Sequence, residues 1–475
     1  MHEVPGATLA VLADGQVHEA ATGVLNVETG VAVTPDAVFQ SGSIGKLFIA
    51  TAAIQLVERG ELDLDAPVAS MLPGFRLADP VATGLVTPRQ LLSHTSGIEG
   101  DHFPDLGRGL DVVERFVENC AELGQVHPPG ATMSYCNTGY VIAGRLIEVA
   151  TGLPWMEALR QRVFEPLGMR SSVVLPEEVL RFRAAFGHMR PAVSGETPRL
   201  APVWNLPPST GPAGDVCQTA RDLVAFARMH LDAGRGPDGV PVLSPAGVRA
   251  MQTPQTTVPD PFTVGDHWGL GWILANWSGR RVILHDGSSV GQQGWLVVVP
   301  DAQVAMALMT NGDGGHDLER ELFRELLLDL ADVRMPAPLQ PPDPPPAPAA
   351  GLCGRYQTTA WRIDVAQHDG RLMATVTQLG SLATLTDNPV RQLVLEPARP
   401  NVFVVSEGGT RTGEVMVFYG VPGGGRYLHM GGRALPRVAS LSPEAGCSAA
   451  PRPPRRARTP HPPPRSTTPW PLPSE

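Results

Sequence analysis

A serine and a lysine three residues apart are the first side chains in this sequence that could do chemistry together. Ser43 and Lys46 lie in Gln40-Ser41-Gly42-Ser43-Ile44-Gly45-Lys46, and Lys46 is the only lysine among 37 basic residues. Arginine keeps its charge, whereas a desolvated lysine can lose its proton and act as a base. The S-x-x-K spacing places the hydroxyl and the amine on one face of a helix. The pair therefore predicts a serine nucleophile beside its own base.

The elements that must position this pair are an apolar helix and the strands around it. From Ser43 to Arg59 the pattern is helical and nearly all apolar, with Gly60 as a C-terminal cap, so this helix is expected to be buried. Asp14-Gly15 predicts a hairpin between two opening strands. The expected fold class is α/β, with a helical insertion between two halves of one sheet. Strands are expected at 7–13, 16–21, 269–275, 281–285, 294–299 and 304–309, and helices at 111–123, 139–151, 219–233 and 316–330.

Prolines divide the remainder of the chain. Residues 336–350 hold eight prolines in fifteen positions, a composition that favours an extended, semi-rigid spacer of roughly 45 Å. We therefore expect an α/β domain at 1–333, a Pro-rich linker at 334–350 and a small all-β barrel or sandwich at 351–437. Residues 438–475 are rich in proline and arginine, cannot bury a core and are expected to be a disordered tail.

Composition argues against nucleic acid and membranes as partners. The net charge is -10 and aromatic residues make up 5% of the chain, whereas a nucleic-acid-binding protein normally has a basic face. No apolar run reaches the roughly 18 residues that span a bilayer. The five cysteines are odd in number and scattered, so we expect free thiols and neither a disulfide framework nor a metal site.

Three segments, in this order, resemble the serine β-lactamase and penicillin-binding-protein family, in particular its class C-like branch with DD-peptidases, esterases and D-aminopeptidases. Ser43-Ile44-Gly45-Lys46 begins the buried helix, Tyr135-Cys136-Asn137 follows Pro129-Gly130, and His285-Asp286-Gly287 ends a strand. The resemblance covers residues 4 to 330. It implies a β-lactamase/transpeptidase-like fold, with an antiparallel sheet flanked by helices. It also implies a serine hydrolase that cleaves an ester, amide or lactam through an acyl-enzyme without a cofactor.

The resemblance implies catalytic roles for three residues. Ser43 is the expected nucleophile at the head of the helix. Lys46 is the first candidate for the base that takes its proton, because burial lowers the pKa of a lysine. Tyr135 is the second candidate and is expected to move the proton to the leaving group. Either Lys46 or Tyr135 could be the general base.

The resemblance also implies residues that bind the substrate. The backbone NH groups of Ser43 and Ser288 are the expected donors to the oxyanion. Gly287 would let the substrate lie against the strand, and Asn137 would orient Lys46 or a substrate carbonyl. His285 is expected at the substrate as well.

The third motif departs from the Lys-Thr-Gly that lactamases of this branch usually carry. His285-Asp286-Gly287 removes a fixed cation and adds a carboxylate, which weakens the case for a β-lactam or a C-terminal carboxylate as substrate. A histidine there resembles esterases and D-aminopeptidases. Arg280 or Arg281 could still supply a charge if the strand register directed either one to the site. We therefore expect an esterase or peptidase acting on a small ester, amide or peptide.

Other interpretations of the same residues are weaker. Ser289 lies in a G-x-S-x-G pattern, but the nucleophile elbow of α/β hydrolases needs a helix after the serine, and a strand-like segment follows here. His94 and the loop 311–317 lack the partners of a metal site. A non-catalytic acyl-binding sensor or scaffold remains the alternative function, and intact Ser43, Lys46 and Tyr135 argue against it.

The N-terminus bears on localisation. Met1-His2-Glu3-Val4-Pro5 lacks the layout of a signal peptide, so the chain as written is expected in the cytoplasm. Relatives normally have a helix before the first strand, which this sequence lacks. If translation starts upstream, a signal peptide could precede Met1 and the protein would be secreted or periplasmic. The sequence predicts no oligomeric state.

Overall fold

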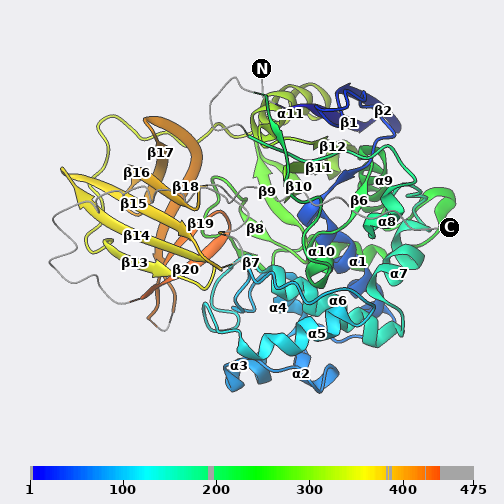
Figure 1. Cartoon of the computed structure of the whole chain (residues 1–475), viewed down its shortest axis with the longest axis horizontal. Coiled ribbons are helices and arrows are strands. Elements are labelled where there is room, and N and C mark those ends of the chain that lie inside the picture. The colour runs from blue at the N-terminus through cyan, green and yellow to red at the C-terminus, as the bar shows by residue number, and fades with distance from the viewer. Residues whose placement is uncertain (1–3, 191–196, 381–382, 384–387, 423, 439–475) are drawn as a thin grey trace, which may run out of the picture.

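An antiparallel sheet of eight strands forms the centre of the first part of the chain (Figure 1). The computed structural model describes residues 4–190, 197–380, 383, 388–422 and 424–438. The strand order is β2-β1-β12-β11-β10-β9-β8-β7, so strands from both ends of this part pair in one sheet, as the sequence predicts. The strands are β1 (Gly6–Ala13), β2 (Gln16–Gly23), β7 (Thr256–Thr257), β8 (His267–Trp268), β9 (Ile273–Trp277), β10 (Arg280–Ser289), β11 (Gln292–Val299) and β12 (Val304–Thr310).

Helices cover both faces of this sheet. The apolar helix α1 (Gly45–Glu58) packs with α6 (Asn137–Thr151) and α9 (Ala220–Leu231) in the main core, which includes one face of the sheet. The other face packs against α11 (Gly315–Ala331) through Phe323 and Leu327. The other helices are α2 (Val68–Met71), α3 (Pro80–Leu85), α4 (Pro88–Leu92), α5 (Val112–Asn119), α7 (Trp155–Leu159), α8 (Pro176–Val179) and α10 (Pro245–Met251).

Short elements join these layers. The helix expected from Ser43 begins instead as a 3₁₀ turn at Gly42–Ile44 and becomes α-helical at Gly45. Two two-stranded ladders pair β3 (Phe39–Gln40) with β6 (Cys217–Gln218) and β4 (His188–Met189) with β5 (Arg199–Leu200). Further 3₁₀ or π turns lie at Cys120–Glu122, Arg160–Phe164, Pro208–Ala213, Pro237–Gly239 and Pro300–Ala302.

The C-terminal part is a closed antiparallel barrel, which decides between the barrel and the sandwich expected from the sequence. Alternate side chains of its strands, such as Ile363, Val365 and Ala374, fill the interior, because successive residues of a strand point to opposite faces. The strands are β13 (Gly354–Gln357), β14 (Trp361–His368), β15 (Arg371–Gln378), β16 (Val390–Arg399), β17 (Val402–Glu407), β18 (Thr410–Gly420), β19 (Arg426–Met430) and β20 (Arg433–Val438). The expected tail lies outside the described residues, except Val438, which ends β20.

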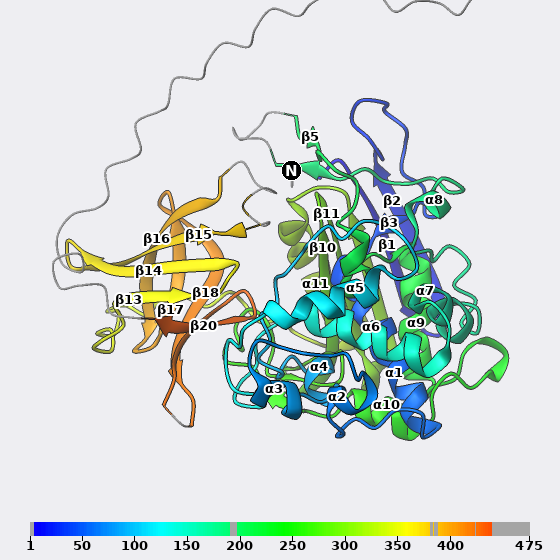
Figure 2. The ribbon, with the colours of Figure 1, turned by 60° about the horizontal axis from the view of Figure 1, so that its bottom comes forward.

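The barrel lies directly against the first part of the chain (Figure 2). The Tyr135 N–H donates to the Gly432 carbonyl at 2.8 Å, and the Ala434 N–H donates to Ser134 Oγ at 3.1 Å. The proline-rich spacer predicted from composition therefore does not hold the barrel away. Proline content indicates how extended a segment is, and the direction of the linker is decided by packing. The domain limits themselves stay a prediction.

Candidate active site

Ser43 and Lys46 form a hydrogen-bonded pair at the start of α1. The Lys46 Nζ lies 2.9 Å from Ser43 Oγ and donates to the Ala213 carbonyl at 2.5 Å. The turn at Gly42–Ile44 presents the half-buried Ser43, while Lys46 on the first turn of α1 is fully buried. The S-x-x-K spacing thus brings hydroxyl and amine into contact, as predicted.

The surroundings of Lys46 favour its neutral form. Burial, and secondarily the positive charge of Arg433, lower the pKa of Lys46 from 10.5 to about 7, although Asp101, Cys136 and Asp286 act in the opposite direction. Both acceptors of its amine are uncharged, so no carboxylate of the described residues pairs directly with it. A substantial share of this amine is therefore unprotonated near neutral pH.

The edge of β10 lies against the turn that carries Ser43. A Cβ atom on Gly287 would come within 2.0 Å of the Ser41 carbonyl oxygen and 2.8 Å of the Ser43 nitrogen, and one on Gly42 within 2.6 Å of the Ser288 nitrogen. Gly42 also has a φ of 52°, in the left-handed region that favours glycine. The missing side chain of Gly287 therefore makes room for the turn that carries Ser43, and the backbones of residues 42–43 and Ser288 come together.

Tyr135 lies over this pair, in contact with both amine and hydroxyl. Its ring centroid is 4.9 Å from Lys46 Nζ, and it stacks on His94 with centroids 4.3 Å apart. Burial raises the pKa of Tyr135 far above its usual value, which the nearby Ser43 hydroxyl offsets in part. The phenolic oxygen makes no hydrogen bond of regular geometry to any described side chain or backbone group. Tyr135 is thus a half-buried residue whose buried phenolic oxygen is protonated and lies beside Ser43.

His94 supports the ring of Tyr135. Its Nδ1 accepts the Cys136 N–H at 2.9 Å, so the buried imidazole is a neutral platform under Tyr135. No group of three or more His, Cys, Asp or Glu side chains in the described ranges is arranged to hold a metal ion. The thiols Cys120, Cys136 and Cys217 are free, as expected, and Cys447 lies outside the described residues.

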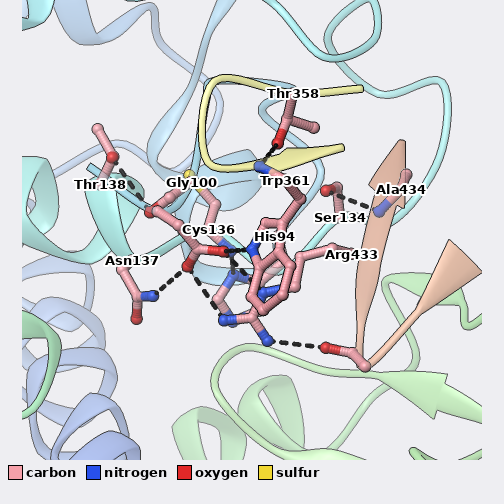
Figure 3. Close-up of polar contacts among 12 residues, drawn as sticks. His94, Gly100, Ser134, Cys136, Asn137, Thr138, Thr358, Trp361, Arg433 and Ala434 are labelled. Atoms are coloured by element: carbon pink, nitrogen blue, oxygen red, sulfur yellow. Dashed lines mark hydrogen bonds and ion pairs between the residues drawn. The ribbon is translucent and has the colours of Figure 1, made fainter. Parts of the chain in front are cut away.

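Asn137 begins α6 and is held by a carboxylate that sequence reasoning missed. Its Nδ2 donates to Asp101 Oδ1 at 2.9 Å, and both side chains are almost fully buried. Asp101 also binds Arg433 and Trp361 of the barrel (Figure 3). No local pattern marks these three residues, because their contacts join distant parts of the chain.

A cavity of about 620 Å³ contains Ser43 in its wall. Five of the predicted site residues line it, namely Ser43, Tyr135, Asn137, Gly287 and Ser288, while Lys46 lies beneath the surface. Linker residues 335–339 and barrel residues 412–415 and 431–433 complete the wall. The barrel and linker therefore shape the space in which a substrate would lie.

His285 is not brought to this wall. Its Nδ1 lies 2.6 Å from the Asp286 carbonyl, its ring is buried behind Tyr135 and Trp268, and burial lowers its pKa to about 4. The exposed Asp286 lines the cavity instead. Neighbouring residues of a strand face opposite sides, so the register that turns Asp286 outward turns His285 inward.

Besides the predicted carboxylate of Asp286, the cavity has charges that the sequence did not predict. Arg281 binds Gln252, and neither it nor Arg280 lines the cavity, so these arginines do not replace the missing cation of the third motif. Arg320 and Arg433 line it instead. Acidic lining residues are Asp215, Asp286, Asp317, Glu319 and Glu414; burial raises the pKa of Asp215 to about 7, and burial together with Asp286 raises that of Glu319 to about 8.

The rival nucleophile has the wrong surroundings, as its sequence context indicates. Ser289 ends β10, binds the Gln40 side chain and is followed by a tight turn into β11. No helix follows it, so the geometry of a nucleophile elbow is absent.

The first 331 residues match the family model described as Beta-lactamase. Penicillin-binding protein 4 of Amycolatopsis lactamdurans is 51% identical over 359 residues, 75% of this chain and 94% of that protein. Crystal structures of SurE, alone and with D-Leu, superpose with TM-scores of 0.73 and 0.71, at 32% identity over 92% of this chain and 96% of SurE.

A D-amino acid amidase from Ochrobactrum anthropi, solved with D-phenylalanine, is 25% identical, with a TM-score of 0.55 over 67% of this chain and 93% of the amidase. None of these relatives is described as a sensor or scaffold, so the comparisons do not support that alternative function. No helix in the described part of the chain is long and apolar enough to cross a membrane. The matched family model, the S-x-x-K pair and the shared fold lead to one conclusion: the chain belongs to the beta-lactamase family and is a serine hydrolase of that family.

Proposed function

We propose that this enzyme hydrolyses small esters or amides through an acyl-enzyme on Ser43, and that it is an esterase or peptidase and not a dedicated β-lactamase. The contact between the buried Lys46 amine and the Ser43 hydroxyl, 2.9 Å long, carries the proposal. Serine is inert until a neighbouring group accepts its proton, and an amine with a pKa near 7 is suited to that task.

Acylation follows from these contacts. Neutral Lys46 takes the proton of Ser43 as its oxygen bonds to the substrate carbonyl carbon. The N–H groups of Ser43 and Ser288 then stabilise the oxyanion. When the bond to the leaving group breaks, the proton passes from Lys46 through Tyr135 to the departing oxygen or nitrogen. Water then attacks the acyl carbon, the same groups move its proton to the Ser43 oxygen, and the acid is released.

The two candidates for the general base have opposite protonation. Burial keeps the Tyr135 phenol protonated at neutral pH, whereas Lys46 is partly unprotonated there. We assign Lys46 as the base and Tyr135 as the group that relays the proton. Asn137 is assigned to the substrate carbonyl, because its Nδ2 uses one N–H for Asp101 and keeps a second N–H that can donate into the cavity that the residue lines.

The charge of the cavity supports the preference for uncharged substrates. Asp286 is exposed, lines the cavity and forms no ion pair with any described residue. A carboxylate next to the scissile bond, as in β-lactams, would meet repulsion there. SurE with D-Leu and the amidase with D-phenylalanine are structures with D-amino acids. We therefore propose acyl groups that end in a D-residue as the substrate class.

A substrate panel combined with active-site labelling tests this function. The enzyme is incubated with nitrophenyl esters and amides of D- and L-amino acids, nitrocefin and a fluorophosphonate, and the labelled peptide is found by mass spectrometry. The expected result is turnover of D-configured esters or amides faster than nitrocefin, with the label on Ser43. Ser43→Ala should abolish both, whereas Ser289→Ala should keep the label. Labelling that survives Ser43→Ala would refute the site.

A further inference from the structure

One short segment of the barrel reaches the residues around the nucleophile. Gly432 lies in the turn between β19 and β20, and Arg433 and Ala434 begin β20. The Gly432 carbonyl accepts the N–H of Tyr135, the first residue of the second motif, and the Ala434 N–H donates to the preceding Ser134. A Cβ atom on Gly432 would lie 3.4 Å from that of Tyr135. The backbone that carries Tyr135 is thus fixed from the barrel.

Arg433, which lies between Gly432 and Ala434, is half-buried and forms an ion pair with the buried Asp101 of the first part of the chain. Its Nε and Nη2 donate to the two carboxylate oxygens of Asp101 at 2.9 and 3.0 Å. The barrel residue Trp361 adds an indole N–H to the same carboxylate at 3.0 Å. Figure 3 shows Arg433 and Trp361 approaching from the barrel and Asn137 from α6. Such a forked pair fixes orientation as well as charge.

The same carboxylate holds Asn137. Asp101 accepts four hydrogen bonds, two from Arg433 and one each from Trp361 and Asn137. Burial alone would raise the pKa of Asp101, but Arg433 and the other donors hold it below its usual value, so the carboxylate stays ionised. Without Arg433, Asp101 would be a buried anion bound only by neutral donors. The position of Asn137 would then depend on this destabilised carboxylate.

Arg433 also acts on Lys46 through its charge. Its guanidinium carbon lies 5.1 Å from the centroid of Tyr135, the ring that Lys46 approaches at 4.9 Å. Arg433 lowers and Asp101 raises the pKa of the amine. Other titratable or charged groups interact with Lys46 from three places. They are the α6 N-cap Cys136 and Tyr140 of α6, His94 just after α4, and His285 and Asp286 of β10.

We propose that the barrel completes the acylating site, with Arg433 as a positioning residue that acts through Asp101 on Asn137 and through its charge on Lys46. The inference rests on the proposed function, because it assigns Arg433 a part in acylation of Ser43. It goes beyond that function by giving the C-terminal barrel a catalytic purpose. The charge of Lys46 and the position of Asn137 would then depend on the docked barrel.

Charge-changing variants of the full-length enzyme test this proposal. Arg433→Met removes the cation, so the pKa of Lys46 should rise and the acid limb of the kcat/KM profile should move up by about one pH unit. The rate at pH 6 should then fall about tenfold relative to the wild type. Asp101→Asn removes the anion, so the same limb should move down.

Two further variants separate charge from position. Asp101→Asn combined with Arg433→Met removes both charges, so the limb should return close to its wild-type midpoint while kcat stays low, because Asn137 is no longer held. This double variant leaves no unpaired buried charge and remains informative if a single variant fails to fold. Arg433→Lys should keep the midpoint and lower kcat, because it retains the charge without the fork.

Arg355→Met is the matched control. It breaks the bidentate barrel pair with Asp364, at 2.7 and 3.1 Å, and neither residue lines the cavity. It should change the melting temperature at most and leave the pH profile unchanged. The proposal is wrong if the two single variants shift the limb in the same direction or not at all. A wild-type enzyme whose Ser43 takes no label would instead refute the proposed function itself.

Discussion

Two cations, the buried Lys46 and the half-buried Arg433, lie against the ring of Tyr135 and differ in what they bind. Lys46 donates to a hydroxyl and a backbone carbonyl, whereas Arg433 binds both oxygens of a carboxylate. Burial without a directly paired anion lowers the pKa of Lys46 to about 7, whereas Asp101 outweighs burial and raises that of Arg433 above its usual value. The side chain and its partner together decide the role: an amine without an adjacent anion can become a base, whereas a guanidinium keeps its charge and the carboxylate fixes its position.

Lys46→Arg is expected to have the largest effect, because it makes the first cation like the second. The guanidinium keeps the charge but cannot accept the Ser43 proton at any accessible pH. Acylation of Ser43 should fall by about 10³-fold, the range typical for loss of a general base. Stopped-flow measurement of nitrophenyl release checks this. Near-normal acylation by the variant would show that Lys46 is not the base.

Gly287→Ala should be the next most damaging change, since it displaces the Ser43–Lys46 pair without touching the Asp101–Arg433 pair. The added Cβ would come within 2.0 Å of the Ser41 carbonyl oxygen, so the turn that carries Ser43 must shift. A misplacement of this kind costs about 10²-fold in rate. Gly84→Ala, where a Cβ meets nothing within 4 Å, is the control. Equal kcat values for the two variants would contradict the close packing of β10 on the nucleophile.

Asp286→Asn tests the unpaired anion in the cavity. Removing its charge should raise kcat/KM for substrates with a carboxylate about fivefold relative to uncharged esters, in line with a Coulomb term of about 1 kcal/mol in water. Glu319→Gln is the matched control, because burial already raises the pKa of Glu319 to about 8 and leaves it mostly neutral at pH 7. A similar change of preference in both variants would contradict the assignment to Asp286.

Tyr419→Phe should have the smallest effect, although it also removes a contact between the barrel and the first part of the chain. The Tyr419 hydroxyl lies 3.2 Å from that of Thr132, and one such bond contributes about 1 kcal/mol to stability. We expect a slightly lower melting temperature and an unchanged kcat. A loss of kcat as large as that of Arg433→Met would mean that any weakening of barrel docking, and not the ion pair, governs activity.

The two cation sites also differ in how far the sequence predicts them. Ser43 and Lys46 are three residues apart, so helix geometry alone predicts their contact. Asp101 and Arg433 are separated by 332 positions, and no local pattern reports a pair formed by packing. The antiparallel sheet, the buried α1 and the all-β C-terminal part were predictable from periodicity. The inward direction of His285 depends on strand register, and the docking of the barrel depends on surface complementarity.

The single lysine allows a direct measurement of the central claim, that the Lys46 amine is the base. Protein labelled with ¹³C at the lysine Cε carbon has one lysine signal, which reports the protonation of Nζ across a pH titration. We predict a midpoint near pH 7, in agreement with the pKa of about 7 for Lys46. A signal that stays at the shift of a charged lysine until the pH approaches 10.5, the ordinary value, would contradict the account.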